Sequence, residues 1–378
     1  SHSAHHMRRA DSPTQRRLRH LSSSCQPGCG SLYSAAGGRS PLGPAVEGLL
    51  AEHQGSNPGA SVLVVHHGEV LLRHCSGQAD CASAERVQSG TNFRLASVTK
   101  QFTAVAILLL RDGGSLRLSD TLCDIFSDFP PYGRDVQVHH LLQHTSGLRD
   151  YFGLLPPERT EQVSDADVLQ MMREQSGTDF PPGSAYAYSN TGYCVLAEII
   201  AAVSGQTFSD FLAERIFGPL GMRRTLAHND HLDSTVPQRA FGHSREAGGE
   251  WRRDDQSLTS ATLGDGGVYT SIDDMLIWER MWMHGSSAAL PLLASTVAEV
   301  FTPGRLSTGE VIEYGFGFRI GEGIGGRLRH SHTGSTRGFR NVYLRCPREG
   351  LAVIVLTNRD EGEPEAIATQ IAATILAE

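Results

Sequence analysis

The stretch "ASVTKQF" contains the only lysine of the chain, Lys100, among 33 lysines and arginines. If Ser97 begins a helix, Lys100 lies three residues later on the same helix face. A serine hydroxyl is a weak nucleophile until a base removes its proton. A buried lysine can lose its own proton and serve as that base, which an arginine cannot do. The spacing therefore indicates a nucleophile and its base, although a lysine left by chance at a helix start would look the same.

A second polar motif, "YSN", follows a Pro-Pro-Gly turn and precedes an apolar, helix-like stretch. A tyrosine at such a place, here Tyr188, can carry a proton to or from a substrate. The amide of Asn190 can both donate to and accept from a substrate amide. The alternative is an ordinary loop with a helix N-cap at Asn190 or Thr191.

A third motif, His332-Thr333-Gly334, ends a short strand-like run and is followed by Ser335. Glycine lets a ligand approach the backbone closely. The hydroxyls of Thr333 and Ser335 could bind a carboxylate or a carbonyl oxygen. The alternative is a glycine-rich hairpin edge without a ligand.

The elements that must position these motifs follow from the hydrophobic periodicity. Residues 60–77 and 338–358 each predict a pair of strands joined by a turn. Helical spacing predicts helices in several places between them and one after the last strand. These helices are expected at 45–53, 97–112, 137–143, 166–173, 191–204, 207–217 and 364–378. The pattern predicts one sheet built from both ends of the chain and a helical lobe inserted between its strands.

Composition narrows the function further. The chain has 378 residues, of which 39% are hydrophobic, which is typical of a globular protein with a sizeable core. Its formal net charge of −8 argues against binding to nucleic acid or to an anionic membrane surface. No apolar run reaches the roughly 18 residues that a membrane-spanning helix needs. "SHSAHHM" is interpreted as a tag remnant, and the arginine- and serine-rich residues 8–40 as a loosely packed arm.

Seven cysteines are scattered along the chain, which is not the pattern of a disulfide framework. Cys25 and Cys29 have a spacing found in metal sites, but no second ligand pair follows them. Unpaired thiols are therefore expected. The neighbouring histidines 66–67 and 139–140 are likewise interpreted as surface or packing residues.

Together and in this order, the motifs SVTK, YSN and HTG resemble those of the serine β-lactamase and penicillin-binding-protein-like hydrolases. Several connecting segments resemble that family too. They are "HHLLQHTSGLRDY" at 139–151, "FLAERIFGPLGM" at 211–222, "LGDGGVYTSIDDMLIW" at 263–278 and "VIVLTN" at 353–358. The resemblance runs from about residue 45 to the end of the chain. It implies an α/β (α+β) fold of the β-lactamase/transpeptidase type, with an antiparallel sheet of five to nine strands flanked by helices.

The resemblance also implies roles for the motif residues. Ser97 would be the acylated nucleophile, and Lys100 and Tyr188 would share the general acid and base work. Asn190 would hold the amide on the acyl side of the substrate. His332 stands where many β-lactamases have a lysine, so it would supply a hydrogen bond, with or without a positive charge, beside Tyr188.

The backbone N–H groups of Ser97 and Ser335 would form an oxyanion hole, and Thr333 and Gly334 would line the substrate site. One oxyanion-hole donor is typically worth about 3 kcal/mol of barrier. The reaction would pass through an acyl-enzyme that water then resolves. It needs no cofactor and no metal.

The substrate class is open at this stage. With His-Thr-Gly in the third motif, the chain most resembles the soluble D-alanyl-D-alanine carboxypeptidases of the family. These bind the terminal carboxylate of the substrate through an arginine on the neighbouring strand, and Arg319 matches that position. Arginine forms bidentate pairs with carboxylates. The alternatives are a family VIII-type carboxylesterase, a D-amino-acid amidase or aminopeptidase, a weak β-lactamase and a penicillin sensor that acylates without turnover.

The family resemblance implies a division of the chain into three parts. Residues 1–44 would be the tag remnant and arm, 45–95 with 262–378 the sheet part, and 96–261 the helical lobe, with the site in the cleft between the last two. The expected partner is a small-molecule or short-peptide substrate, namely an ester, a D-amino-acid amide or a β-lactam. The sequence shows no signal peptide, and a periplasmic or secreted location is possible if one was removed.

Overall fold

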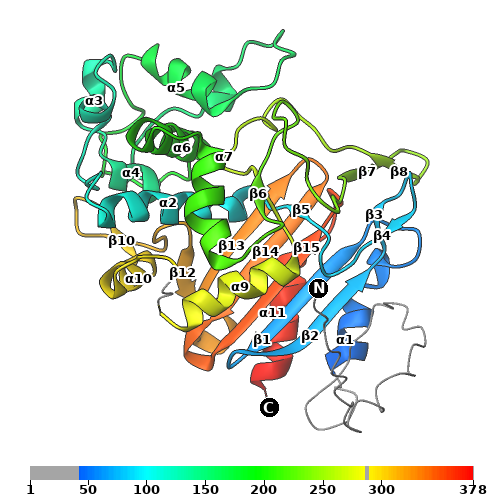
Figure 1. Cartoon of the computed structure of the whole chain (residues 1–378). Helices are drawn as coiled ribbons and strands as arrows, with labels where there is room; N and C mark the ends of the chain where they lie inside the picture. Colours follow the sequence, from blue (N-terminus) through cyan, green and yellow to red (C-terminus); the bar gives the residue numbers. More distant parts are fainter. Residues whose placement is uncertain (1–41, 286–288, 378) are drawn as a thin grey trace, which may run out of the picture.

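The structure is a computed structural model, and it describes residues 42–285 and 289–377 (Figure 1). The tag remnant, most of the expected arm and the Cys25–Cys29 pair lie outside these ranges. Residues 42–44, which were expected in the arm, instead form the first turn of helix α1 (Leu42–Leu49). The helix expected at 45–53 therefore begins earlier, and a short 3-10 turn at Ala51–His53 completes it.

A six-stranded antiparallel sheet in the order β12-β13-β14-β15-β1-β2 forms the centre of the molecule. It consists of β1 (Ala60–His66), β2 (Glu69–Ser76), β12 (Arg319–Glu322), β13 (Leu328–Thr336), β14 (Phe339–Cys346) and β15 (Leu351–Thr357). The first strand pairs with the last, Ala60 opposite Thr357. The antiparallel sheet built from both ends of the chain is thus confirmed.

The sheet is covered by helices on both faces, and the sequence of β1 shows why. Neighbouring side chains of a strand point to opposite faces. Val62 and Val64 pack with α1 and with the closing helix α11 (Pro364–Leu376). Leu63 and Val65 belong to the larger cluster on the other face, where α9 (Ile272–Met283) lies across the strands (Figure 1). Strands that are buried on both faces become continuous apolar runs, as "VLVV" and "LAVIVL" are.

The other helices come mainly from the middle of the chain. They are α2 (Lys100–Asp112), α3 (Leu122–Ile125), α4 (Val138–Leu142), α5 (Asp165–Arg173), α6 (Asn190–Ser204), α7 (Phe208–Leu212), α8 (Gly218–Leu220) and α10 (Ala294–Val300). The segment 207–217 was expected as one helix, and it is helical without a break from Phe208. Its turn at Ala213–Phe217 is π-helical, and α8 continues the helix past the expected end to Leu220.

Short strands occupy part of the region that was expected to be a helical lobe. They are β6 (Leu226–Ala227), β7 (His243–Arg245) and β8 (Trp251–Arg253), beside β3 (Gln78–Asp80), β4 (Glu85–Arg86), β5 (Phe93–Arg94), β9 (Val268–Thr270), β10 (Gly304–Arg305) and β11 (Val311–Ile312). The order β5-β9-β6 joins strands from both predicted parts. The division at 96–261 remains a prediction, and residues 223–261 carry no helix.

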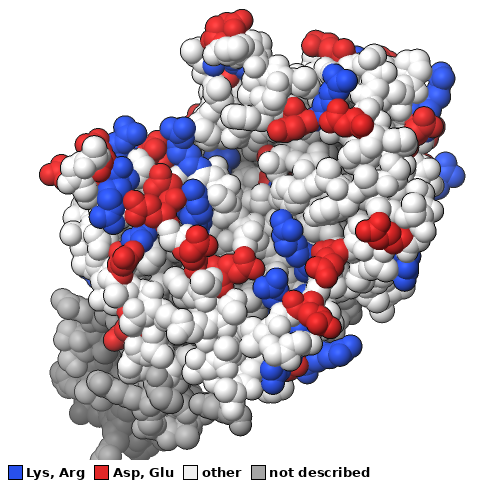
Figure 2. All heavy atoms as spheres, turned by 180° about the vertical axis from the view of Figure 1, so that it is seen from behind, with Lys and Arg blue, Asp and Glu red and all other residues white. Residues whose placement is uncertain are grey.

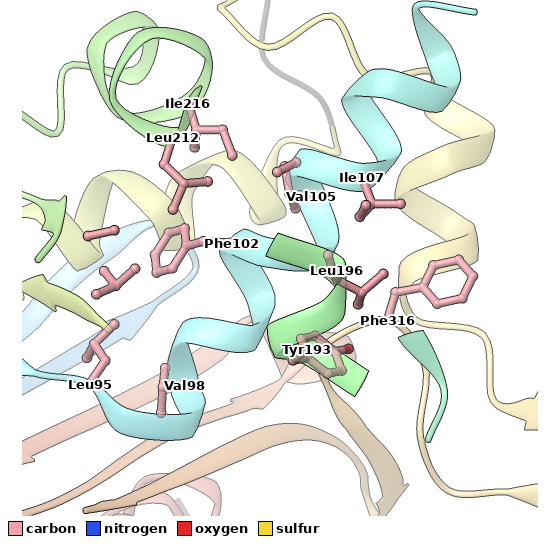
Figure 3. Close-up of a cluster of buried hydrophobic side chains, with 14 of the residues drawn as sticks. Leu95, Val98, Phe102, Val105, Ile107, Tyr193, Leu196, Leu212, Ile216 and Phe316 are labelled. Carbon is pink, nitrogen blue, oxygen red and sulfur yellow. The ribbon is translucent and has the colours of Figure 1, made fainter. Parts of the chain in front are cut away.

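The hydrophobic core around α2 fixes the position of the SVTK motif, which lies at the N-terminus of this helix. Val98 and Phe102 project from the turn and first helical residues toward apolar side chains, with Leu212 nearby (Figure 3). Tyr193 and Leu196 of α6 lie beside α2 in the same cluster (Figure 3). All residues from 100 to 110 are buried. A helix that is buried on every side is held firmly, so the side chains at its N-terminus have little freedom.

Two further features concern the surface and the helices of the described residues. Positive and negative side chains are interspersed over the face seen in Figure 2, without a large area of one sign. No single described helix has the length and hydropathy of a membrane span, and only α6 together with Phe208–Leu220, bent by 78°, passes that test as a pair.

Candidate active site

Ser97 lies in a 3-10 turn, Ala96–Thr99, directly before α2. The preceding residue, Ala96, has a φ of +51°, in the left-handed region that non-glycine residues rarely adopt. Such strain persists only where the surrounding structure holds it, and it is concentrated at functional sites. The serine expected at a helix start is therefore presented on a tight, strained turn.

Lys100 is fully buried and makes three hydrogen bonds. Its Nζ lies 3.0 Å from Ser97 Oγ, 2.9 Å from Asn190 Oδ1 and 2.9 Å from the backbone oxygen of Asp265. No carboxylate of the described residues forms an ion pair with it. The structure thus brings together three residues that are far apart in the sequence around one amine.

The types of these three partners matter for proton transfer. The oxygens of Asn190 and Asp265 can only accept hydrogen bonds, whereas the hydroxyl of Ser97 can also donate. An ammonium donates to all three. A neutral amine would donate to the two pure acceptors and turn its lone pair to the Ser97 hydroxyl. The same geometry therefore suits the proton on either side of the Ser97–Lys100 pair.

Tyr188 lies beside this pair, with two cations over its ring. Lys100 Nζ is 5.0 Å from the ring centroid, and Arg319 Cζ is 5.4 Å from it. Cations at this distance interact favourably with the face of an aromatic ring. The ring of His332 is close as well, with 6.1 Å between the centroids.

His332 differs from its expected role. Its Nε2 lies 3.0 Å from the hydroxyl of Tyr314, and its Nδ1 lies 2.7 Å from the backbone oxygen of Thr333. Because the carbonyl can only accept, Nδ1 carries the proton and Nε2 accepts from Tyr314. Burial, and next the charge of Lys100, lowers the pKa of His332 to about 3. The hydrogen bonds of the His332 ring thus go to Tyr314 and Thr333 rather than to Tyr188, and the lowered pKa favours the neutral ring.

Strand β13 brings the third motif against the nucleophile turn. A side chain at Gly334 would place its Cβ 2.0 Å from the backbone oxygen of Leu95, so only glycine allows this approach. Ser335 and Ser97 then line one cavity of about 330 Å³ together with Asn190 and Asp265. Thr333 is half-buried on the same strand. The cavity is large enough for a small acyl group next to the serine.

Arg319 begins β12, opposite Ser331 of β13. It is exposed and forms no ion pair among the described residues. It lines a second cavity, of about 700 Å³, with Tyr186 and Glu313. Because Arg319 also lies over Tyr188, this second cavity adjoins the Ser97–Lys100 pair and Tyr188.

One group of side chains in the described ranges has the composition of a metal site. The ligand atoms of Asp165, Cys194 and Asp265 lie within 4.8 Å of one another. Burial raises the pKa of Asp165 well above its usual value, and it raises the pKa of Cys194 as well. The protonated forms are therefore favoured, and these bind metal ions poorly.

The structure brings the predicted side chains near one another and adds three neighbours that sequence reasoning missed. The backbone carbonyl of Asp265 has no signature in the sequence, although it lies in the quoted "LGDGG". Tyr314 belongs to no motif. His144 lies in the quoted "HTSG", where only its place in a family-like segment set it apart.

Comparison with known proteins agrees with this geometry. The family model described as Beta-lactamase matches residues 42–377. The chain belongs to the beta-lactamase family. The expected family, the fold and the serine-hydrolase class are thereby confirmed.

Two relatives and one solved structure indicate the range within the family. The chain is 30% identical to penicillin-binding protein 4* of Bacillus subtilis (strain 168), over 80% of this chain and 68% of that protein. It is 32% identical to the D-aminopeptidase of Brucella canis, over 82% of this chain and 58% of that protein. It therefore spans little more than half of the D-aminopeptidase. The penicillin-binding protein homologue from Pyrococcus abyssi, described as octameric, has the same fold, with a TM-score of 0.75 at 24% identity over 89% of this chain and 77% of that chain.

Proposed function

We propose that this beta-lactamase-family chain hydrolyses small peptide or ester substrates through an acyl-enzyme on Ser97, and that it acts as a D-alanyl-D-alanine carboxypeptidase-like peptidase. The observation that carries the first part is the 3.0 Å contact between Ser97 Oγ and the buried Nζ of Lys100. The second part rests on Arg319, which lies beside Tyr188 without an ion-pair partner among the described residues.

In the proposed mechanism, Ser97 Oγ attacks the substrate carbonyl carbon while its proton passes to the neutral amine of Lys100. The negative charge that develops on the carbonyl oxygen would be stabilised by the backbone N–H groups of Ser97 and Ser335. As the bond to the leaving group breaks, Tyr188 would deliver its proton to that group and take up the proton that Lys100 received from Ser97. The product is an ester between Ser97 and the acyl part of the substrate.

Deacylation reverses the proton flow. A water molecule would lose its proton to the same Tyr188–Lys100 pair and attack the ester carbonyl. Ser97 Oγ then leaves and recovers its proton, which regenerates the enzyme. Asn190, held by its bond to Lys100, would orient the acyl-side amide of the substrate in both steps.

The leaving group distinguishes the carboxypeptidase from its alternatives. A peptide that ends in a free carboxylate would place that carboxylate in the cavity of Arg319, where a bidentate pair can form. The similarity to a D-aminopeptidase favours a second candidate, in which the substrate carries a free amine on its acyl side. Esterase and weak β-lactamase activities need only the shared nucleophile.

The testing experiment follows the intact mass of the protein over time after addition of a penicillin. We expect an adduct of one acyl group on the wild type and none on Ser97→Ala. A persistent adduct would support the penicillin-binding, carboxypeptidase-like function. Adduct formation on Ser97→Ala would refute the nucleophile. If no adduct forms while a p-nitrophenyl ester is still hydrolysed, the esterase or D-aminopeptidase function gains support.

A further inference from the structure

The remaining inference concerns His144, a buried histidine to which the proposed mechanism assigns no role. It follows α4 and is 1% exposed. Its φ is +58°, so a non-glycine residue is held here in the left-handed region. Backbone strain of this kind needs a compensating purpose or support from its surroundings.

His144 makes two hydrogen bonds to the residues that flank Tyr188. Its backbone oxygen accepts from the N–H of Ala187 at 2.9 Å. Its ring Nδ1 accepts from the N–H of Ser189 at 3.0 Å. No other residue of the described ranges bonds to the backbone N–H on both sides of Tyr188.

The ring of His144 also packs directly against the Tyr188 ring. The centroids are 4.3 Å apart, with 37° between the planes. On its other sides it contacts the rings of Tyr193, at 5.2 Å, and Tyr314, at 4.5 Å. Tyr188 is thereby fixed both along the chain and across its ring face.

The protonation state of His144 follows from its partners. Because Nδ1 accepts from an N–H, the proton of the neutral ring must lie on Nε2. Nε2 is buried and has no hydrogen-bond partner. Burial, and next the charge of Lys100, holds the pKa of His144 well below its usual value. A second proton on Nδ1 would break the bond to Ser189, so the arrangement needs the neutral ring.

The rest of the loop shows why such support is needed. Ala187 and Tyr186 are exposed, and Tyr188 is only half-buried. Before Tyr186, the loop is attached to the segment after α4 by hydrogen bonds from the N–H of Gly183 to the oxygen of Thr145 and from the N–H of Asp179 to the oxygen of Gly147. The rings of His332 and Tyr314 also lie near Tyr188, at 6.1 Å and 6.4 Å, so the 4.3 Å contact with His144 is the shortest ring contact of this side chain among the described residues.

We propose that His144 is a positioning residue that holds Tyr188 beside Lys100 through hydrogen bonds to both neighbouring residues and through ring packing. The inference rests on the proposed function, because it assumes that Tyr188 transfers protons to or from the substrate. His144 itself touches neither substrate nor the reacting atoms. Its loss should therefore slow the chemical step rather than weaken substrate binding.

The test compares two variants of His144 with a matched control. His144→Phe keeps a ring but removes the acceptor for Ser189. His144→Asn keeps an acceptor and tolerates a positive φ. The control is His53→Phe, because His53 is also a buried histidine, 4% exposed, and lines neither of the two cavities beside the nucleophile.

Steady-state kinetics with a neutral p-nitrophenyl ester give the readout, with thermal melting to confirm folding. For His144→Phe we expect kcat to fall by about 100-fold with KM little changed, since displacement of a catalytic group by about 1 Å has an effect of this size. His144→Asn should recover about tenfold of that loss, the value of one restored hydrogen bond. His53→Phe should keep the wild-type kcat.

Three results would overturn the inference. They are equal kcat values for His144→Phe and His53→Phe, no recovery in His144→Asn, or a parallel change of kcat and KM. Failure of the proposed function is distinguishable, because it would show as turnover by Ser97→Ala whatever the His144 variants do.

Discussion

Replacement of Lys100 by methionine should separate catalysis from stability. When the proton of the Ser97–Lys100 pair is on Lys100, the buried amine donates three hydrogen bonds, and it has no ion-pair partner in the described ranges. Hydrogen bonds to charged groups are worth about 1.5–3 kcal/mol each, so loss of the three costs roughly 5–9 kcal/mol. The substitution also removes the desolvation penalty of a buried ion. That penalty is several kcal/mol, and its removal stabilises the variant. The two contributions largely cancel, and we expect the free energy of unfolding to change by no more than about 2–3 kcal/mol.

For the rate of acylation, no second contribution offsets the loss of the amine. Loss of a general base typically costs 10²- to 10⁴-fold in rate, or about 3–5 kcal/mol of barrier. Lys100→Met should therefore acylate at least about 100-fold more slowly while it remains folded. Lys100→Arg is the matched variant, because it keeps the charge but cannot give up its proton at neutral pH.

The assay combines stopped-flow acylation by a chromogenic ester with urea unfolding of the same samples. Near-normal acylation by Lys100→Arg would refute the assignment of Lys100 as the base. Loss of several kcal/mol of stability in Lys100→Met, well beyond the expected range, would show that the three hydrogen bonds outweigh the desolvation of the amine.

The remaining predictions concern the substrate, pH and a buried ion pair. Arg319→Ala should lower kcat/KM about tenfold for substrates that end in a carboxylate and spare neutral esters, as measured by parallel steady-state assays. The control is Arg329→Ala, because Arg329 lines the same cavity but is paired with Glu365. Equal losses on both substrates in Arg319→Ala would contradict the carboxylate role. Burial is the main cause that lowers the pKa of His53 and His140 to about 4 and of His330 and His332 to about 3. Because the unfolded chain binds these protons already near pH 6.5, stability should fall as the pH decreases from about 6.5 towards 4, and an unchanged urea midpoint at pH 4.5 would be inconsistent with this. Glu279→Gln should lower the free energy of unfolding by about 3–5 kcal/mol, because it leaves the Arg345 guanidinium, whose Nε lies 2.8 Å from the carboxylate, buried without a counter-charge. Glu299→Gln, at the partly exposed pair with Arg111, should lower it by about 1 kcal/mol or less. Equal midpoints in urea for the two variants would contradict the argument.

Much of the fold could be predicted from the sequence because it follows from local patterns. Continuous apolar runs such as "LAVIVL" predict buried strands, and "AILLLRDGG" ends a helix at its glycines. The predictions were incomplete where a local pattern leaves a choice. The amphipathic segment 207–217 contains a helical pattern throughout, but its π-helical turn depends on packing against neighbours. The two- and three-residue strands at 226–253 are too short to show a period.

The sequence by itself determined which chemical groups are available. A single lysine three residues after a serine, a Tyr-x-Asn motif and a His-Thr-Gly motif specify the nucleophile, the proton carriers and the amide that the proposed mechanism needs. These properties belong to the side chains, so they are visible before the chain folds. The same motifs also carry the resemblance to the family that the comparison confirms.

Only the tertiary structure decided how these groups are set relative to one another. The backbone oxygen of Asp265 accepts from Lys100, and burial lowers the pKa of His332 to about 3. A carbonyl is common to every residue, and the charge of a histidine depends on its surroundings rather than on its identity. The contact of His144 with the residues around Tyr188 likewise exists only because two segments about 45 residues apart meet in the folded chain.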